Sequence, residues 1–216
     1  MTSGSVAIIT GACSGIGEAF TLDLVSKGWR IAMFDIKPNA DLVTKLEDAV
    51  TFYQVDVADY ESQAKCFQET WDKFGRLDLV CTNAGIFDQS GSKAAVWQFV
   101  RASAQILRMK ENIRINCIRP GSIATPLMPA AMAAAAGSSI TPMSTVISAM
   151  NRIITDESLS GEALECSVDK VLLTPDPEPL NGETSTRACF VWDPIFHQIH
   201  HEPSGLPDAA DPVQTK

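Results

Sequence analysis

Long apolar runs and an excess of basic residues are both missing from this sequence. No stretch approaches the ~20 consecutive apolar residues that a membrane-spanning helix needs, so no membrane association is expected. Only 17 lysines and arginines stand against 26 acidic residues, which gives a formal net charge of −9. An acidic surface repels phosphate backbones, so nucleic acid is not expected as a partner either.

Cysteine and histidine are too scattered to indicate a disulfide framework or a metal site. None of the six cysteines stands in C-x-x-C spacing with another, so free thiols in a reducing compartment are expected. The three histidines fall in "HQIHH" (197–201) without a cluster of acids or cysteines, and we expect no metal there. The first residues lack the basic segment and apolar run of a signal peptide. We therefore expect a soluble, cytoplasmic protein.

The sequence does contain a regular alternation of strand-like and helix-like segments. Because parallel strands joined by helices form right-handed crossovers, this order predicts an α/β fold with a Rossmann-like, doubly wound parallel sheet. We expect a single domain over residues 1–200 and a disordered tail over 201–216. Short apolar, β-rich runs occupy residues 5–10, 30–35, 50–56, 77–83, 113–120 and 163–173.

An alanine-rich segment follows the fifth strand-like run. Residues 129–139 could form a lid helix over a substrate pocket or a surface loop, and residues 141–155 have helical spacing after Pro142. The whole segment 129–155 is therefore a candidate substrate lid. The earlier helix expected over 92–109 presents Val96, Phe99, Val100 and Leu107 on one apolar face.

The stretch "TGACSGIG" (10–17) lies between the first strand-like run and a helix-like segment. Gly11 allows a tight turn, Gly15 lets the backbone approach a diphosphate, and Gly17 lets the helix pack close to the sheet. The helix that follows offers free N–H groups and a partial positive charge to phosphate groups. With a strand before it and a helix after it, this loop predicts a dinucleotide site.

Asp35 ends the second strand-like run, 24 residues after Gly11. A carboxylate at this place can accept hydrogen bonds from both hydroxyls of an adenosine ribose, and it repels a 2′-phosphate. We therefore expect NAD as the cofactor, with NADP less favoured. Lys37 stands close by and could weaken that preference.

Together these stretches resemble the short-chain dehydrogenase/reductase family. The resemblance covers residues 5 to about 127, and "SVDKVLL" and "VWDPIFHQIHHEPSG" resemble the branch near 15-hydroxyprostaglandin dehydrogenase. It implies an NAD(P)-dependent oxidoreductase that acts on a secondary alcohol or ketone of a small molecule, in this branch within secondary-metabolite biosynthesis. The motifs are the loop at 10–17, Asp35, "DV" at 56–57, "NAG" at 83–85, "SKAAV" at 92–96 and "INCIRPGSIATPL" at 115–127.

The resemblance also implies a role for each matched residue. Asp56 and Val57 would flank the adenine, and Lys93 would bind the nicotinamide ribose and lower the pKa of a catalytic tyrosine. The remaining implied cofactor residues are Gly11, Ser14, Gly15, Ile16 and Gly17 in the glycine loop, Asn83, Ala84 and Gly85 after the fourth strand, and Pro120, Gly121, Ile123 and Thr125 after the fifth.

The stretch between Gly85 and Lys93 departs from the family. The family motif is Tyr-x-x-x-Lys, but Gln89 stands four residues before Lys93, and a carboxamide does not titrate near neutral pH. The strand that carries the family's catalytic serine is missing too. Seven residues, 86–92, replace material that amounts to roughly sixty residues at about thirty for each βαβ unit. We expect that the strand after this junction could pair where the lost strand stood.

Three hypotheses therefore remain open. The chain is an NAD-dependent oxidoreductase, a catalytically impaired nucleotide-binding protein, or a truncated or spliced form of an active dehydrogenase. A small-molecule substrate is the expected partner. The family would also suggest a homo-oligomer, but a helix that commonly builds its interface is missing here, and the helix over 92–109 should expose an apolar stripe.

Overall fold

The computed structural model describes residues 4–86, 92–175, 180 and 193–203. The chain divides into two compact units. The first combines residues 1–90 with 118–156 and 165–172, and the second combines 91–117, 157–164 and 173–216. The glycine loop, Asp35 and the segment after Pro120 all belong to the first unit, whereas Lys93 belongs to the second.

A parallel four-stranded sheet forms the core of the first unit. Its strand order is β3-β2-β1-β4, with β1 at the centre paired to β2 on one side and to β4 on the other. Val6 of β1 aligns with Arg30 of β2, and Thr10 aligns with Phe34. The strands are β1 (Val6–Thr10), β2 (Arg30–Asp35), β3 (Val50–Gln54) and β4 (Leu79–Cys81).

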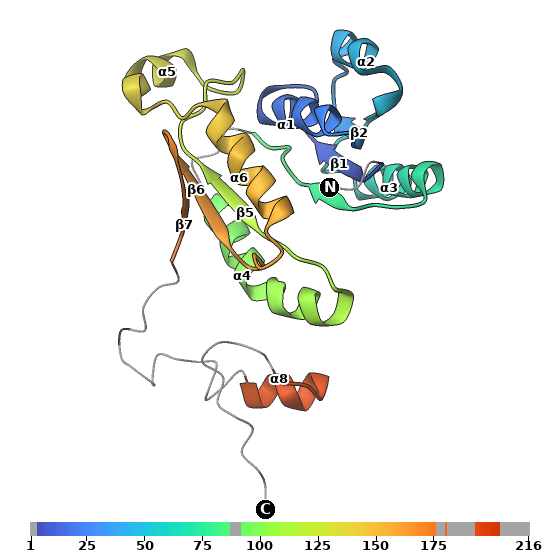
Figure 1. Cartoon of the computed structure of the whole chain (residues 1–216), viewed down its shortest axis with the longest axis vertical. Coiled ribbons are helices and arrows are strands. Elements are labelled where there is room, and N and C mark those ends of the chain that lie inside the picture. Colours follow the sequence, from blue (N-terminus) through green and yellow to red (C-terminus); the bar gives the residue numbers. More distant parts are fainter. Residues whose placement is uncertain (1–3, 87–91, 176–179, 181–192, 204–216) are drawn as a thin grey trace, which may run out of the picture. The chain divides into compact units, whose positions relative to one another are not determined.

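Three helices connect these strands (Figure 1). Right-handed crossovers place the first two helices on one face of the sheet and the third on the other, because the chain reverses its direction across the sheet after β3. This arrangement confirms the predicted doubly wound α/β fold. The helices are α1 (Gly15–Ser26), α2 (Ala40–Leu46), which ends in a 3₁₀ turn at Glu47–Ala49, and α3 (Tyr60–Phe74).

Both faces of the sheet are packed. On one face the Phe34 ring meets the Tyr53 and Phe67 rings edge-on, with ring centroids 5.4 and 5.6 Å away. Strand side chains alternate between faces, so Ile9 and Met33 point the other way, and both are fully buried. Such two-sided burial is typical of a parallel sheet covered by helices, and it explains why these strands read as continuous apolar runs.

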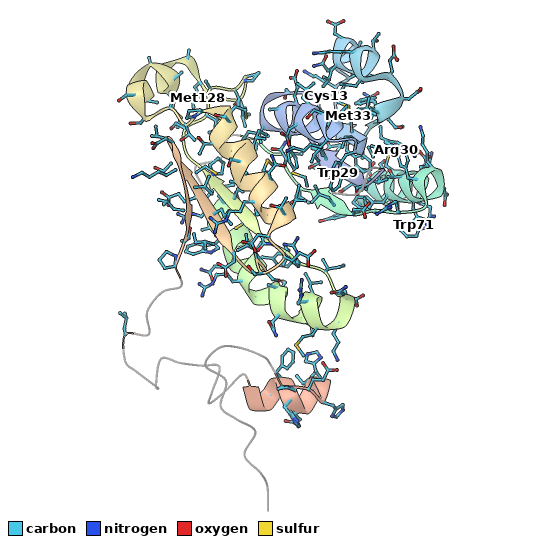
Figure 2. All side chains as sticks on the ribbon, in the orientation of Figure 1. Cys13, Trp29, Arg30, Met33, Trp71 and Met128 are labelled. Carbon is cyan, nitrogen blue, oxygen red and sulfur yellow. The ribbon has the colours of Figure 1, made fainter. Side chains whose placement is uncertain are left out.

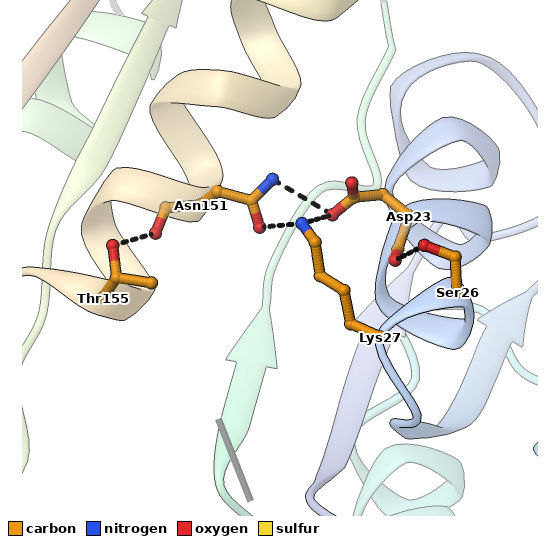
Figure 3. Close-up of polar contacts among 5 residues, drawn as sticks. All are labelled: Asp23, Ser26, Lys27, Asn151 and Thr155. Carbon is orange, nitrogen blue, oxygen red and sulfur yellow. Dashed lines mark hydrogen bonds and ion pairs between the residues drawn. The ribbon is translucent and has the colours of Figure 1, made fainter. Parts of the chain in front are cut away.

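Helix α6 (Met143–Thr155) joins the first unit by a polar cluster on α1 (Figure 3). Lys27 Nζ donates to Asp23 Oδ2 at 2.6 Å and to Asn151 Oδ1 at 2.7 Å. The Asn151 amide nitrogen donates in turn to Asp23 Oδ2 at 3.1 Å, which closes a three-membered network. On the same helix Val146 and Ala149 are fully buried. Helix α6 is thus anchored against α1.

Helix α5 (Ala130–Ala136) lies just before α6 and buries none of its residues. It begins after Pro129, which forms its N-cap, and a 3₁₀ turn at Gly137–Ser139 follows it. Of the two alternatives for residues 129–139, the chain therefore forms a helix. Its role as a lid stays a prediction.

A second, three-stranded sheet has the order β5-β6-β7. Strand β5 was expected to pair beside β4, and that expectation is wrong, because β5 pairs with β6 instead. The family's intervening strand, which would join β4 to β5, is missing, so the two sheets stay separate. The run 163–173 is two strands rather than one, with a turn at Val168, whose φ is +50°. The strands are β5 (Cys117–Pro120), β6 (Ala163–Ser167) and β7 (Lys170–Leu173).

The second unit contains α4 (Ser92–Glu111) and α8 (Asp193–His200). Helix α4 buries Val100 and Ala104, whereas the exposed fractions of Val96 and Phe99 are 51% and 62%. The apolar face predicted over 92–109 is therefore buried at Val100 and exposed at Val96 and Phe99, and the expected exposed apolar stripe is present. No helix among the described residues is long and apolar enough to cross a membrane. The predicted tail, 201–216, lies outside the described residues from 204 onward.

Candidate cofactor site

The glycine loop connects the end of β1 to the start of α1. Gly11 has a φ of +64°, and a Cβ atom there would lie 3.0 Å from both Ala84 Cα and Asn83 Nδ2. A Cβ at Gly17 would overlap the carbonyl oxygen of Gly11. Any other residue at either position would push the loop away from the sheet or from the segment after β4, so the sequence must have glycine here.

The N-terminus of α1 keeps backbone donors available for a ligand. Its N-cap residue, Ser14, makes no side-chain capping hydrogen bond, so the first N–H groups of the helix have no cap acceptor. Gly15, the first helical residue, has a φ of +55°. Open N–H groups and the positive end of the helix dipole suit a diphosphate group. The loop therefore fits the diphosphate of a dinucleotide.

Asp35 turns its carboxylate onto this loop. Its Oδ2 accepts a hydrogen bond from the backbone N–H of Cys13 at 3.0 Å, and its Oδ1 accepts one from Lys37 N at 3.2 Å. A carboxylate has about four acceptor positions, so Asp35 can still accept from ribose hydroxyls. Cys13 itself is buried beside the start of α1 (Figure 2). Asp35 thus braces the loop and keeps free acceptor positions, and its ribose role stays a prediction.

The segment after β4 lies against the same loop. Asn83 Nδ2 donates to the carbonyl oxygens of Thr10 and Gly11, at 3.0 and 3.3 Å. The hydroxyl oxygen of Thr10 accepts from Asn83 N at 3.0 Å and from Ala84 N at 2.9 Å. These contacts bring the predicted residues Asn83 and Ala84 to the glycine loop. Gly85 follows and is exposed.

Thr10 is a site residue that the sequence reasoning missed. The sequence places it at the end of a strand-like run and at the start of the glycine-loop motif 10–17, but a threonine in a β-rich run usually packs or faces solvent, so no role was expected. Thr10 is only 5% exposed. Its hydroxyl oxygen accepts hydrogen bonds from backbone N–H groups more than 70 positions away. The available signal was its position directly before the first glycine of the loop.

The two segments meet where the order of strands reverses. The chain leaves β1 toward β2 on one side, and it later returns to β4 on the other. In open α/β sheets the crevice at such a switch point, beyond the carboxyl ends of the strands, is where ligands bind. Gly11 follows β1 and Asn83 follows β4, so both lie at this place in the fold.

The residues expected around the adenine follow β3. Asp56 Oδ1 accepts from Ala58 N at 2.9 Å, which stabilises the turn into α3. The carbonyl oxygen of Val57 accepts from the Gln63 side chain at 2.6 Å, and Val57 as a residue is 38% exposed. An exposed valine on a fixed turn offers an apolar surface to a flat ring. The adenine role of both residues stays a prediction.

Part of the segment after β5 also reaches the glycine loop. A Cβ at Gly15 would lie 3.3 Å from the Thr125 side chain, so Thr125 borders the start of α1. Gly121 N donates to Cys166 O at 2.9 Å, and Ile123 is buried. Pro120 and Gly121 are exposed. Of the four residues expected here, Thr125 is the one that the structure brings beside the loop.

The residues at the family's catalytic positions lie outside the first unit or outside the described residues. Lys93 is exposed in the first turn of α4, within the second unit, and Gln89 lies outside the described residues. Neither tyrosine replaces the missing base. Tyr53 packs on Phe34, and burial raises the pKa of its phenol, while Tyr60 is 84% exposed at the start of α3. Neither tyrosine is therefore a candidate for the family's acid–base group.

Two thiols border the site, at Cys13 in the loop and at Cys81 at the end of β4. Burial is the main cause that raises the pKa of the Cys13 thiol, and it raises that of Cys81 to about 12. Both are therefore neutral thiols near pH 7 and poor nucleophiles. Among the described residues, no group of His, Cys, Asp and Glu side chains is placed to hold a metal ion.

Comparison with known proteins identifies the family. The short chain dehydrogenase profile matches residues 5–91. The short-chain dehydrogenase/reductase prx6 of Penicillium rubens is 32% identical over 292 aligned positions, which cover 96% of this chain and 98% of that protein. The chain belongs to the short-chain dehydrogenase/reductase family. The predicted family is thus confirmed. In this member the strands form two sheets, one of four strands and one of three, among the described residues.

The match to 15-hydroxyprostaglandin dehydrogenase is partial. The Bos taurus enzyme, named as NAD(+)-dependent, is 41% identical over 91 residues, which cover 39% of this chain and 34% of that protein. The family profile also stops at residue 91, inside the junction between Gly85 and Lys93. The Penicillium relative has at least 76 aligned positions that this 216-residue chain lacks. That exceeds the roughly sixty expected from two βα steps.

Solved structures share the fold. A 3-ketoacyl-(acyl-carrier-protein) reductase from Brucella melitensis, complexed with NADH, has a TM-score of 0.65 and 17% identity, over 76% of this chain and 96% of that one. A 4-hydroxyisoleucine dehydrogenase complexed with NADH has a TM-score of 0.67 and 18% identity, over 76% and 98%. Both bind a nicotinamide cofactor on the fold that this chain adopts.

Proposed function

We propose that this chain is an NAD-dependent oxidoreductase that acts on a secondary alcohol or ketone of a small molecule, within secondary metabolism. One observation carries the choice of cofactor: the Asp35 carboxylate accepts from Cys13 N at 3.0 Å, at the edge of the glycine loop. A carboxylate held there suits the two hydroxyls of the adenosine ribose. It disfavours a 2′-phosphate through repulsion between like charges.

Different residues of the chain would bind different parts of the cofactor. The open N–H groups at the start of α1 would hold the diphosphate, and Asp35 would hold the ribose. Val57 would lie against the adenine, and Asn83 would keep the segment after β4 against the loop. When bound, NAD would supply a hydride acceptor at C4 of its nicotinamide ring.

Oxidation of an alcohol also releases the hydroxyl proton, and this chain offers no titratable group in the place of the family tyrosine. Gln89 occupies that place in the sequence, four residues before Lys93. General acid–base catalysis is typically worth ~10²–10⁴-fold in rate. We therefore propose that the 216-residue chain binds NAD well and transfers hydride slowly.

A second candidate is a nucleotide-binding protein without turnover, or a shortened form of an active dehydrogenase. It is favoured by the positions that the Penicillium relative has and this chain lacks. The intact mass of the protein from its native source separates these cases. A mass near 23.3 kDa supports a genuine short form. A mass that is larger by the mass of the segment missing between Gly85 and Lys93 supports a longer enzyme with the Tyr-x-x-x-Lys motif.

Restoring the tyrosine tests the catalytic part of the proposal. NADH formation should be followed with a panel of secondary alcohols for the natural chain, for Gln89→Tyr and for Ser90→Tyr. We expect Gln89→Tyr to be faster than the natural chain, because it recreates Tyr-x-x-x-Lys. Ser90→Tyr, one position out of register, should give no gain. Rapid turnover by the natural chain would show that the proton acceptor lies elsewhere, and equal rates for both variants would favour the binding protein.

A further inference from the structure

We propose that Asn39 is a positioning residue for cofactor binding, which holds the glycine loop against Asp35 at the adenosine end of the site. This inference rests on the proposed NAD site. Asn39 does not need to touch the cofactor. It acts on the Cys13 peptide, which directly precedes the N-terminus of α1.

The Asn39 side chain makes two hydrogen bonds in different directions. Its Oδ1 accepts from Leu42 N at 3.1 Å, so Asn39 is the N-cap of α2. Its Nδ2 donates to the carbonyl oxygen of Cys13 at 3.2 Å. The first bond is an ordinary helix cap, which serine or aspartate makes as well. The second bond needs a donor at the place of the amide nitrogen, which aspartate lacks and which the shorter serine side chain does not reach while its oxygen caps the helix.

The Cys13 residue is consequently held at both of its backbone polar groups. Its N–H donates to Asp35 Oδ2, and its carbonyl oxygen accepts from Asn39, two residues of the same β2–α2 connection. Cys13 is only 7% exposed, so little water reaches it to replace a lost partner. A buried carbonyl without a partner is unfavourable, and the peptide would have to turn to find one.

The position of this peptide matters because the two binding elements meet there. The diphosphate donors begin just after Cys13, and the ribose carboxylate is Asp35 itself. Earlier in the loop, Gly11 N donates to Phe34 O at 2.8 Å, and the longer Ala12 bond goes to the same oxygen at 3.4 Å. Cys13 is therefore the point where the loop is tied to the β2–α2 connection by side chains. Without Asn39, binding would have to order this peptide, which weakens affinity.

Two substitutions separate the helix-capping bond of Asn39 from its hydrogen bond to Cys13 O. Asn39→Asp and Asn39→Ser both keep an acceptor for Leu42 N, and both lose the hydrogen bond to Cys13 O, aspartate because it has no donor and serine because its side chain is too short. The serine variant is neutral, so it distinguishes the lost hydrogen bond from added charge. Asp59→Asn is the matched control, because Asp59 also caps a helix, α3, by accepting from Ser62 N at 3.1 Å, and its other carboxylate oxygen accepts from the Ser62 hydroxyl.

The affinities of NAD and of ADP-ribose should be measured by calorimetry on the full chain, together with amide hydrogen exchange of residues 11–17 in the free protein. We expect both Asn39 variants to bind NAD and ADP-ribose about tenfold more weakly, by the same factor, since the hydrogen bond from Asn39 to Cys13 O acts on the adenosine half. Exchange in 11–17 should be faster in the free variants. Asp59→Asn should change none of these quantities.

The outcomes distinguish this inference from the function it rests on. If the natural chain binds neither ligand, the proposed cofactor site fails and the inference fails with it. If the natural chain binds NAD and the two Asn39 variants bind it equally well, with unchanged exchange over 11–17, Asn39 is only a helix cap and the inference is overturned.

Discussion

The hydroxyl oxygen of Thr10 accepts a hydrogen bond from the backbone N–H of Ala84, 2.9 Å away and 74 residues later in the chain. The same oxygen accepts from Asn83 N at 3.0 Å. One side chain therefore closes the gap between the end of β1 and the segment after β4, where the cofactor is expected. The glycine loop and this segment form a single structure through Thr10.

Removing that hydroxyl should destabilise the protein. Thr10→Val keeps the shape of the side chain and removes the acceptor of Ala84 N in a buried place, while Asn83 N keeps its bond to Cys81 O at 3.0 Å. A buried donor that loses its partner typically costs about 1–3 kcal/mol. We expect the free energy of unfolding, measured with urea, to fall by about this amount.

Thr21→Val is the matched control for Thr10→Val. The Thr21 hydroxyl is fully buried in α1 and has no hydrogen-bond partner among the described residues. Replacing it with a methyl group removes an unpaired polar atom, so stability should stay the same or rise. If both valine variants lose the same stability, the role given to Thr10 is wrong.

Alanine substitutions at Gly11 and Gly75 separate the effect of backbone strain from the effect of close packing. Their φ angles are +64° and +66°, but a Cβ at Gly11 would lie 3.0 Å from Ala84 Cα, while nothing lies within 4 Å of one at Gly75. We expect Gly75→Ala to cost about 1 kcal/mol in stability and to leave NAD affinity unchanged. Gly11→Ala should lose more stability and weaken NAD binding at least about tenfold. Equal NAD affinities for the two variants would contradict the packing argument.

Asp35→Asn should reduce the preference for NAD. The amide oxygen can still accept from Cys13 N, so the loop keeps its brace, but the negative charge that repels a 2′-phosphate is gone. We expect NAD to bind about tenfold more weakly and the ratio of NAD to NADP affinity to fall further. Calorimetric titration with both cofactors measures this ratio. Asp41→Asn, which removes an exposed charge in the first turn of α2, should leave the ratio unchanged.

Stability should fall as the solution becomes alkaline. Burial raises the pKa of the Cys81 thiol to about 12, and it also raises those of Cys13, Cys66 and Cys166. In the unfolded chain a thiol titrates near about 8.5. Between these values the unfolded state loses protons that the folded state keeps, so the contribution present below about pH 8.5 is lost as the pH rises toward 12.

The slope of stability against pH above about 8.5 is the measurement for this prediction. Urea unfolding at a series of alkaline pH values should give a steadily decreasing free energy of unfolding. Cys81→Ala should give a shallower slope, since one of the raised thiols is gone. A Cys81→Ala slope equal to that of the natural chain would mean that the folded thiol ionises as easily as the unfolded one.

Most of the first unit could be predicted from sequence, because its signals are local. The apolar strands, the glycine loop and Asp35 each lie within a few residues of the feature they define. Thr10 and Asn39 could not be found in this way. Their partners, Ala84 and Cys13, are set by the folded sheet and by the β2–α2 connection, and threonine and asparagine have many ordinary roles at strand ends and helix caps.

The second sheet shows that the sequence pattern does not predict which strands pair. The run at 113–120 has the same pattern whether it joins the first sheet or another, since apolar alternation reports burial and not the identity of the neighbouring strand. Its pairing depends on the strand that this chain lacks. Val96 and Phe99 of α4 also carry an apolar pattern, and their exposure could be expected only from the missing neighbouring helix, not from the pattern itself.

Calorimetric titration of NAD into the purified 216-residue chain tests the central claim most directly, namely that the glycine loop and Asp35 form a working cofactor site. Circular dichroism on the same sample establishes that the protein is folded. We predict saturable binding of one NAD per chain, tighter than that of NADP, and abolished or strongly weakened in Gly11→Ala. A folded chain that binds neither cofactor would contradict this account.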